Sequence, residues 1–113
     1  MTPAFPVEIL TLHLGANDRW QGRPLFEEIV DRCRGAAVEQ VLVQRGISGY
    51  GASSVIHRHH FFGRSGDDPI AVTVVARPEV ADALLPHLSQ IIGGGLITRD
   101  RSEARRYSGE AAC

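Results

Sequence analysis

Residues 45–51 combine the side chains and backbone that most readily form an anion-binding loop. Three of them are glycines: Gly46, Gly49 and Gly51. Glycine backbones adopt positive φ and can turn their N–H groups outward. Arg45 adds a guanidinium, which pairs with carboxylate or phosphate groups, and Tyr50 adds a ring that can stack on a base. The alternative interpretation of this stretch is a flexible hinge.

A second glycine run and an arginine pair offer further anion-binding groups. The run consists of Gly93, Gly94 and Gly95, and its N–H groups could hold an anion. Alternatively, it caps a helix and makes a tight turn, since a helix C-terminus carries partial negative charge that disfavours phosphate. Arg105 and Arg106 could clamp an anion from the tail. The alternative for this pair is a solvated tail whose charges contribute little.

Three histidines lie in the segment between these groups: His57, His59 and His60. If the segment is extended, His57 and His59 share one face and could bind a divalent metal. Two imidazoles are too few for a closed site, so a trimer axis or His13 would have to supply more. The alternative is a solvated arm that responds to pH, because imidazoles titrate near neutrality.

The hydrophobic pattern predicts the scaffold for these groups. Apolar and β-branched runs predict four strands, at 7–14, 38–45, 70–75 and 96–98. Apolar residues at helical spacing predict two helices, from Pro24 to about Gly35 and from Pro78 to the second glycine run. Pro86 is expected to kink or break the second helix. A long loop at 47–69 would join the second and third strands.

This order of elements predicts a single α+β domain over residues 1–113. Two strand–helix–strand units form the split βαβ, ferredoxin-like sandwich. Residues 1–6 would be an N-terminal extension and 99–113 a polar C-terminal tail. Both faces of the first strand are largely apolar, whereas two helices can cover only one face of a four-stranded sheet. The sequence therefore predicts that the other face packs between subunits.

Composition excludes several classes of function. The 113 residues carry a formal net charge of -1, which gives no argument for nucleic-acid or membrane-surface binding. The two cysteines, Cys33 and Cys113, have no zinc-site spacing, so a reduced, cytoplasmic setting is expected. The first residues do not form a signal peptide, and no run approaches the ~20 apolar residues of a membrane span. Without a nucleophile motif, Walker motif or Rossmann motif, we do not expect an enzyme.

Several stretches together resemble a known family. They are Gly22–Glu27, Arg45–Gly51, Val55–His57, Asp68–Val72 and Ile92–Thr98. In this order they are similar to short PII-like proteins of unknown function, often encoded beside fluoride-channel genes. The resemblance covers about Glu8 to Tyr107. Leu96 departs from the wider PII pattern, which has a phosphate-binding lysine there.

The resemblance implies a homotrimer of the PII superfamily that binds small anionic effectors, commonly adenine nucleotides, in clefts between subunits. The ligand-binding residues carried over are Arg45, Gly46, Gly49, Tyr50, Gly51, Gly93, Gly94, Gly95, Arg105 and Arg106. The long loop would contact a regulated partner. Two alternatives stay open: a divalent-metal-binding trimer that uses His57, His59 and His60, and a structural accessory of a membrane channel or transporter.

Overall fold

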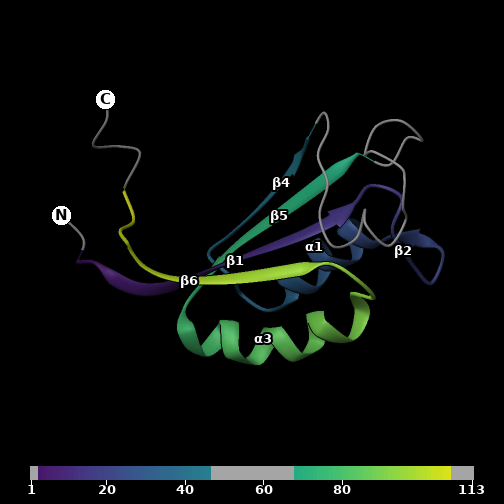
Figure 1. Cartoon of the computed structure of the whole chain (residues 1–113). Helices are drawn as coiled ribbons and strands as arrows, with labels where there is room; N and C mark the ends of the chain where they lie inside the picture. The colour runs from purple at the N-terminus through teal and green to yellow at the C-terminus, as the bar shows by residue number, and fades with distance from the viewer. Residues whose placement is uncertain (1–2, 47–67, 108–113) are drawn as a thin grey trace.

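The computed structural model describes residues 3–46 and 68–107. Gly49, Tyr50, Gly51 and the three loop histidines His57, His59 and His60 lie outside the described residues, so their predicted roles stay predictions. Figure 1 shows a sheet of long strands with two helices beneath it. The elements are β1 Phe5–Gly15, β2 Arg19–Trp20, β3 Arg23–Pro24, α1 Leu25–Gly35, β4 Gln40–Arg45, β5 Pro69–Ala76, α3 Pro78–Ile91 and β6 Leu96–Ala104.

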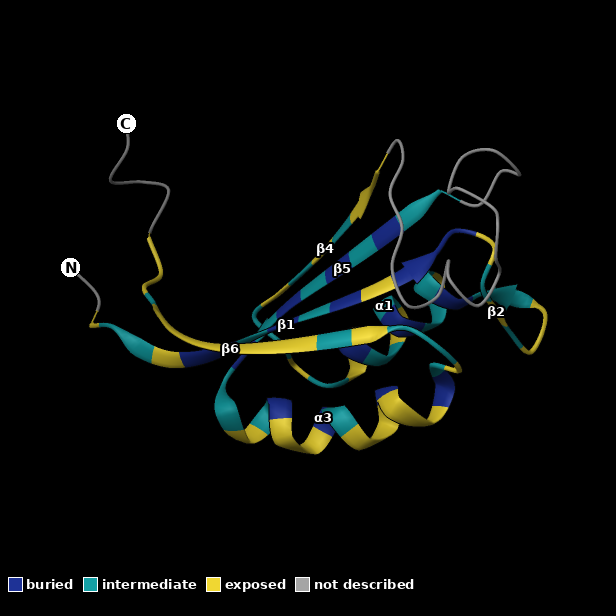
Figure 2. Cartoon of the chain, viewed as in Figure 1, coloured by how far each residue is buried: buried dark blue, intermediate teal, exposed yellow. Residues whose placement is uncertain are grey.

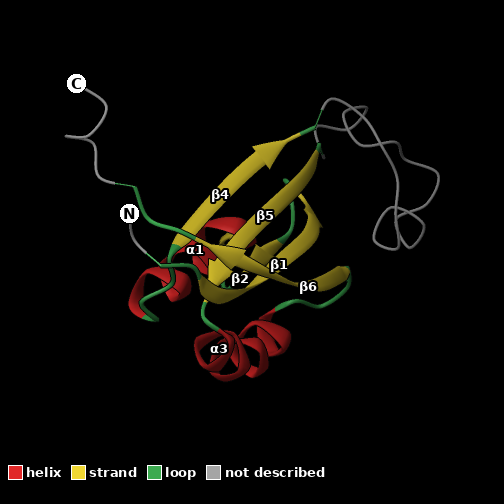
Figure 3. Ribbon diagram, turned by 90° about the vertical axis from the view of Figure 1, so that its left-hand side faces the viewer, coloured by secondary structure: helices red, strands yellow, loops and turns green. Residues whose placement is uncertain are grey.

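The four long strands form one antiparallel sheet in the order β4-β5-β1-β6. β1 lies in the middle and pairs Thr11 with Thr73 of β5 on one side and with Thr98 of β6 on the other. Both helices lie on the same side of this sheet (Figure 3). The predicted ferredoxin-like α+β fold is therefore confirmed, with the two halves interleaved as the split βαβ topology requires.

The core lies between the sheet and the two helices. Alternate residues of β1 and β5 point into it, including Leu10, Leu12, Val72 and Val74, which are completely buried. The helices contribute Ile29 of α1 and Leu88 of α3, among others. Figure 2 shows the buried positions of α3 facing the sheet and the exposed ones facing away. Burial alternates with period two along the strands because successive side chains point to opposite faces.

Two expectations about the C-terminal half are corrected. β6 does not end at Thr98 but continues to Ala104, and it pairs with β1 from Phe5↔Ala104 to His13↔Leu96. Residues 99–104 thus belong to the sheet and not to a tail, and Phe5 belongs to β1 and not to an extension. The polar pattern of this part of β6 hid the strand, because an edge strand can be solvated along most of its length.

Pro86 does not break its helix, since α3 runs as one element from Pro78 to Ile91. Proline removes one backbone donor and crowds the preceding turn. Leu84 and Leu88 flank Pro86 and are both buried in the core. The packing of this apolar stripe therefore offsets the local cost of the proline.

A small hairpin that the pattern did not reveal precedes α1. β2 and β3 pair Trp20 with Arg23 across a turn in which Gln21 and Gly22 have φ of 50° and 85°. Positive φ at both central residues is the signature of a type I′ turn. Arg23 then reaches α1, where it donates hydrogen bonds to Glu28 at 2.8 Å and Asp31 at 2.9 Å. This hairpin fixes the entry of the chain into α1.

A buried carboxylate joins β6 to the body of the fold. Glu8 on β1 has a side chain only 3% exposed, and Arg99 of β6 donates to it at 2.6 Å. Arg99 also donates to Asp82 of α3 at 2.5 Å, and the hydrogen bond to Glu8, followed by that to Asp82, raises the pKa of Arg99. Burying a carboxylate is unfavourable unless it is paired. The two hydrogen bonds of the Arg99 guanidinium therefore hold the polar part of β6 over the start of α3.

Candidate functional site

The predicted anion-binding groups occupy two opposite ends of the sheet. Because the sheet is antiparallel, the end of β4 with Arg45 and Gly46 lies at the same end as the start of β6, which follows Gly93–Gly95. Arg105 and Arg106 follow the end of β6, beside the start of β1 (Figure 1). Nine residues of strand separate the two groups, which corresponds to about 30 Å. One subunit therefore does not bring its glycine run and its arginine pair together.

The glycine at the base of the long loop has a structural reason. The Gly46 N–H donates to the carbonyl oxygen of Pro69 at 2.8 Å. A Cβ at Gly46 would lie 2.8 Å from Cγ of Pro69, closer than real Cβ contacts come. Arg45 pairs with Asp68 at 3.3 Å, and its side chain is 58% exposed. This exposure leaves the Arg45 guanidinium accessible to a ligand at the sheet end.

The second glycine run contains one tightly packed and one open position. Gly95 has φ of 152°, and a Cβ there would lie 2.7 Å from the carbonyl oxygen of His13. Gly93 has nothing within 4 Å of the corresponding position. Gly95 is thus explained by its close approach to β1. At Gly93 there is open space in which a ligand could approach the backbone.

The arginine end contains a cluster that the sequence pattern did not predict. Arg106 donates a hydrogen bond to the carboxylate of Glu39, which precedes β4. Arg77, between β5 and α3, lies 3.8 Å from the same carboxylate. Both guanidiniums lie over the ring of Phe5, at 4.3 Å for Arg77 and 5.6 Å for Arg106. The sequence pattern did not reveal this cluster because it ended the last strand at Thr98. In the full-length β6, the pairing of Phe5 with Ala104 brings Phe5 beside the arginine pair.

The face of the sheet away from the helices carries few charges. Three rows run across the sheet, each with one residue from β4, β5, β1 and β6 in that order. The rows are Leu42, Thr73, Thr11, Thr98; Gln40, Val75, Ile9, Asp100; and Gln44, Ala71, His13, Leu96. We call these twelve residues the open face. The sequence predicted an apolar face, and the structure corrects this: about half of the side chains are polar but neutral. Leu42 and Leu96 are 45% and 53% exposed there, which leaves large hydrophobic residues without cover.

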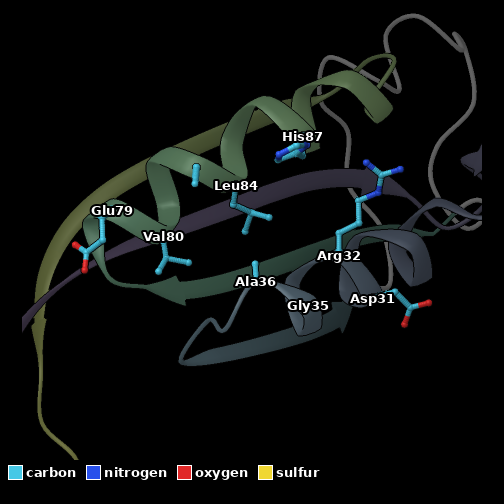
Figure 4. Close-up of a pocket in the computed structure, with 9 residues that line it drawn as sticks. Asp31, Arg32, Gly35, Ala36, Glu79, Val80, Leu84 and His87 are labelled. Atoms are coloured by element: carbon cyan, nitrogen blue, oxygen red, sulfur yellow. The ribbon is translucent and has the colours of Figure 1, made fainter.

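A groove lies on the opposite, helical face of the molecule. It has a volume of about 590 Å³ and is bounded by α1 and α3 (Figure 4). Val80, Ala83 and Leu84 provide apolar lining, and Arg32 and His87 lie among the polar residues around it. None of the sequence-predicted site residues lines this groove. The groove is thus spatially separate from the predicted site, and the two locations can be tested against each other.

Metal binding receives no support from the part of the chain that the structure describes. No group of three or more histidine, cysteine, aspartate or glutamate side chains there could hold a metal ion. His13, which the sequence suggested as a further ligand, is an exposed residue of the open face. Among residues 3–46 and 68–107, no helix has the length and apolar character needed to cross a membrane.

Cys33 is a free thiol on the buried face of α1, as its place on the apolar stripe predicted. Desolvation by burial raises the pKa of this thiol from 9.0 to about 11. In a Cys113→Ser variant, we expect native Cys33 to resist a thiol-specific chromogenic reagent at mildly alkaline pH and to react after unfolding in guanidinium chloride. Rapid labelling of the folded chain would contradict this prediction.

The raised pKa of Cys33 also predicts a pH dependence of stability. The unfolded chain loses the thiol proton near pH 9, whereas the folded chain holds it to about pH 11. The contribution to the free energy of unfolding is therefore complete below pH 9 and is lost as the pH rises through 11. Denaturant titrations across this range should show a smaller alkaline loss in a Cys33→Ala variant, relative to its own value at neutral pH.

The strand order and the likeness to solved structures define the class of protein: the chain has the PII-like form of the ferredoxin-like fold. It belongs to the DUF190 family (Uncharacterized ACR, COG1993), whose model matches residues 7–104. A UPF0166 protein from Aquifex aeolicus is 26% identical over 98 residues, which cover 85% of this chain and 90% of that protein. The family resemblance drawn from the sequence motifs is thus confirmed at the level of a PII-like family of uncharacterised function.

Two solved structures illustrate the likeness in fold. CPII from Thiomonas intermedia K12, bound to ADP, AMP and acetate, is 17% identical with a TM-score of 0.66, over 92% of this chain and 93% of that one. GlnK from B. subtilis, in complex with ATP, is 10% identical with a TM-score of 0.56, over 86% of this chain and 82% of that one. At these identities the likeness establishes the fold.

Proposed function

We infer that the protein is a non-enzymatic, PII-like homotrimer that binds an adenine nucleotide in the clefts between its subunits. The observation that carries this inference is the separation of the anion-binding groups. Arg45 and Gly93 lie at one end of the sheet, and Arg106 lies at the other. A ligand that contacts both groups must therefore lie between two copies of the chain.

The open face supplies the surface on which copies can meet. Two helices cover the other face of the sheet, so this one would remain in water in an isolated subunit. Its central row contains three threonines and Leu42, which can pack and form hydrogen bonds without any buried charge. Packing the open faces around a threefold axis would place the two ends of neighbouring sheets close together.

The ligand class is proposed from chemistry and from the neighbours in fold. Guanidiniums and outward N–H groups suit phosphate oxygens. The related structures of CPII contain ADP and AMP, and that of GlnK contains ATP. Leu96 cannot supply the lysine ammonium of the wider PII pattern, so fewer phosphate charges are neutralised at the glycine run. We therefore expect ADP or AMP to bind more tightly than ATP.

Calorimetric titration of the purified full chain with ADP, AMP and ATP tests this function. We expect one nucleotide per subunit, and a loss of about tenfold in affinity in an Arg106→Ala variant, because charge-assisted hydrogen bonds are strong. Gly93→Ala should also weaken binding while leaving the melting temperature unchanged, since nothing packs against that position.

Ala83→Trp provides the matched control. This exposed residue of α3 lines the groove on the helical face, so a tryptophan there would fill the groove without touching the proposed cleft. We expect unchanged nucleotide affinity. Loss of binding in Ala83→Trp would relocate the site to the groove. Absence of binding heat with all three nucleotides, or wild-type affinity in the Arg105→Ala and Arg106→Ala variants, would reject the proposed function.

A further inference from the structure

The proposed function assigns Arg106 to the ligand, but in this structure Arg106 is hydrogen-bonded to the carboxylate of Glu39. Arg106 donates to this carboxylate, although Glu39 comes 67 residues earlier in the chain. The Glu39 side chain is only 15% exposed, whereas that of Arg106 is 65% exposed. The backbone N–H of Glu39 donates to the carbonyl oxygen of Val75 at 2.7 Å. Glu39 is thus held by the fold, and Arg106 is the more exposed member of the pair.

A second guanidinium can keep Glu39 paired when Arg106 leaves. Arg77 lies 3.8 Å from the same carboxylate, which is longer than a direct hydrogen bond. A half-buried carboxylate that loses its only partner is costly. Here the cost is small, because a small movement of Arg77 can replace the contact that Arg106 gives up. The cluster therefore offers Glu39 a second partner if Arg106 leaves.

Phe5 provides the surface on which this exchange can occur. Its ring lies under the guanidinium of Arg77 at 4.3 Å and that of Arg106 at 5.6 Å. Because a cation–π contact is weakly directional, each guanidinium can shift over the Phe5 ring and keep its contact with it. The start of β1 and the end of β6 lie side by side at this end of the molecule (Figure 1).

We propose that Glu39 is an internal competitor of the effector: an anionic group, such as the phosphate of a nucleotide, takes Arg106 from Glu39, and Arg77 then neutralises Glu39. This inference rests on the proposed function, since Arg106 is the shared residue. Glu39 and Arg77 are positioning residues in this exchange. The exchange couples ligand binding to the position of the chain after Ala104, because Arg106 moves with that segment.

The test compares Glu39→Gln with Glu103→Gln. Glu103 is an exposed glutamate near the same end of β6, and its substitution makes the same change in net charge. Calorimetry with ADP and with inorganic pyrophosphate should show an affinity gain of about five- to tenfold in Glu39→Gln, because the competing charge-assisted hydrogen bond is lost. Glu103→Gln should stay within about twofold of wild type.

A double-mutant cycle with Arg77→Gln separates exchange from general electrostatics. Arg77→Gln alone should weaken ADP binding, because Glu39 then holds Arg106 more firmly. In the Glu39→Gln background, Arg77→Gln should have little further effect, since Arg77 acts through Glu39. Equal effects of Arg77→Gln in both backgrounds would overturn the proposal. Melting temperatures of all variants verify that they are folded.

Trypsin cleavage after Arg106 gives a readout that needs no ligand. An arginine held by Glu39 is a poor protease substrate, so cleavage should be faster in Glu39→Gln than in Glu103→Gln. Equal cleavage rates together with equal affinities would overturn the inference while leaving the proposed function intact. If neither wild type nor Glu39→Gln binds any nucleotide, the proposed function fails. In that case, equal pyrophosphate affinity in Glu39→Gln and Glu103→Gln overturns the exchange as well.

Discussion

Thr73→Glu is expected to convert the proposed trimer into monomers. In sedimentation or light scattering, the wild-type mass should be about 37 kDa, three times the 12.3 kDa of one chain, and the variant should give 12.3 kDa. Thr73 lies in the central row of the open face, paired with Thr11 on β1 and Leu42 on β4. A glutamate there would place one carboxylate from each subunit in the shared core.

The expected effect is large because the charge would be buried without a partner. The open face has a single carboxylate, Asp100, in an outer row, and no arginine. Three buried carboxylates near one axis would repel one another and lose their hydration, at a cost of several kcal/mol for each. In a monomer the same glutamate points into water, so the fold of the subunit is retained.

Ala83→Glu is the matched control for this prediction, because it adds the same charge at an exposed site on the helical face. It should leave the trimer intact. Nucleotide binding should be lost in Thr73→Glu together with the trimer, since each proposed cleft needs two subunits. A wild-type chain of 12.3 kDa in solution, or a trimeric Thr73→Glu variant, would contradict the proposed assembly.

Gly95→Ala should lower the free energy of unfolding by about 3 kcal/mol, because it combines an unfavourable φ with an overlap in the backbone. The added Cβ would lie 2.7 Å from the carbonyl oxygen of His13, and neither group can rotate away. Relief requires β6 to move away from β1 where the two strands begin to pair. Urea titration should show the loss, and the melting temperature should fall by on the order of 10 °C.

Gly93→Ala is the control two residues earlier in the same run. It meets nothing within 4 Å, so its free energy of unfolding should stay within about 0.5 kcal/mol of wild type. The two variants thus separate the structural glycine from the one proposed to approach a ligand. A Gly95→Ala variant as stable as Gly93→Ala would show that the start of β6 is not constrained by His13.

Much of the fold could be predicted from local patterns. The β-branched, apolar run Ile70–Val75 predicted β5, and the apolar stripe through Ile29 and Cys33 predicted α1. The hairpin β2-β3 was missed because Gln21-Gly22 lacks the Asn or Asp that usually signals a type I′ turn. The second half of β6 was missed because its residues are polar and its strand character depends on pairing with β1.

The candidate site could be predicted only in part. Gly46, Gly95 and the arginine pair were found from residue type and spacing. The packing reasons for Gly46 and Gly95 needed the positions of Pro69 and His13, which are distant in sequence. Spacing also could not show that the arginines lie at the other end of the sheet from the glycines, because that follows from the antiparallel strand order.

The sequence by itself determined the succession of the long strands and the helices and the position of Arg45 directly before Gly46, because these depend on neighbours within a few residues. Only the tertiary structure decided that Glu39, Arg77 and Phe5 meet Arg106. The physical reason is register: pairing β1 with both β5 and β6 brings together side chains from four separate segments, and no local pattern encodes that contact.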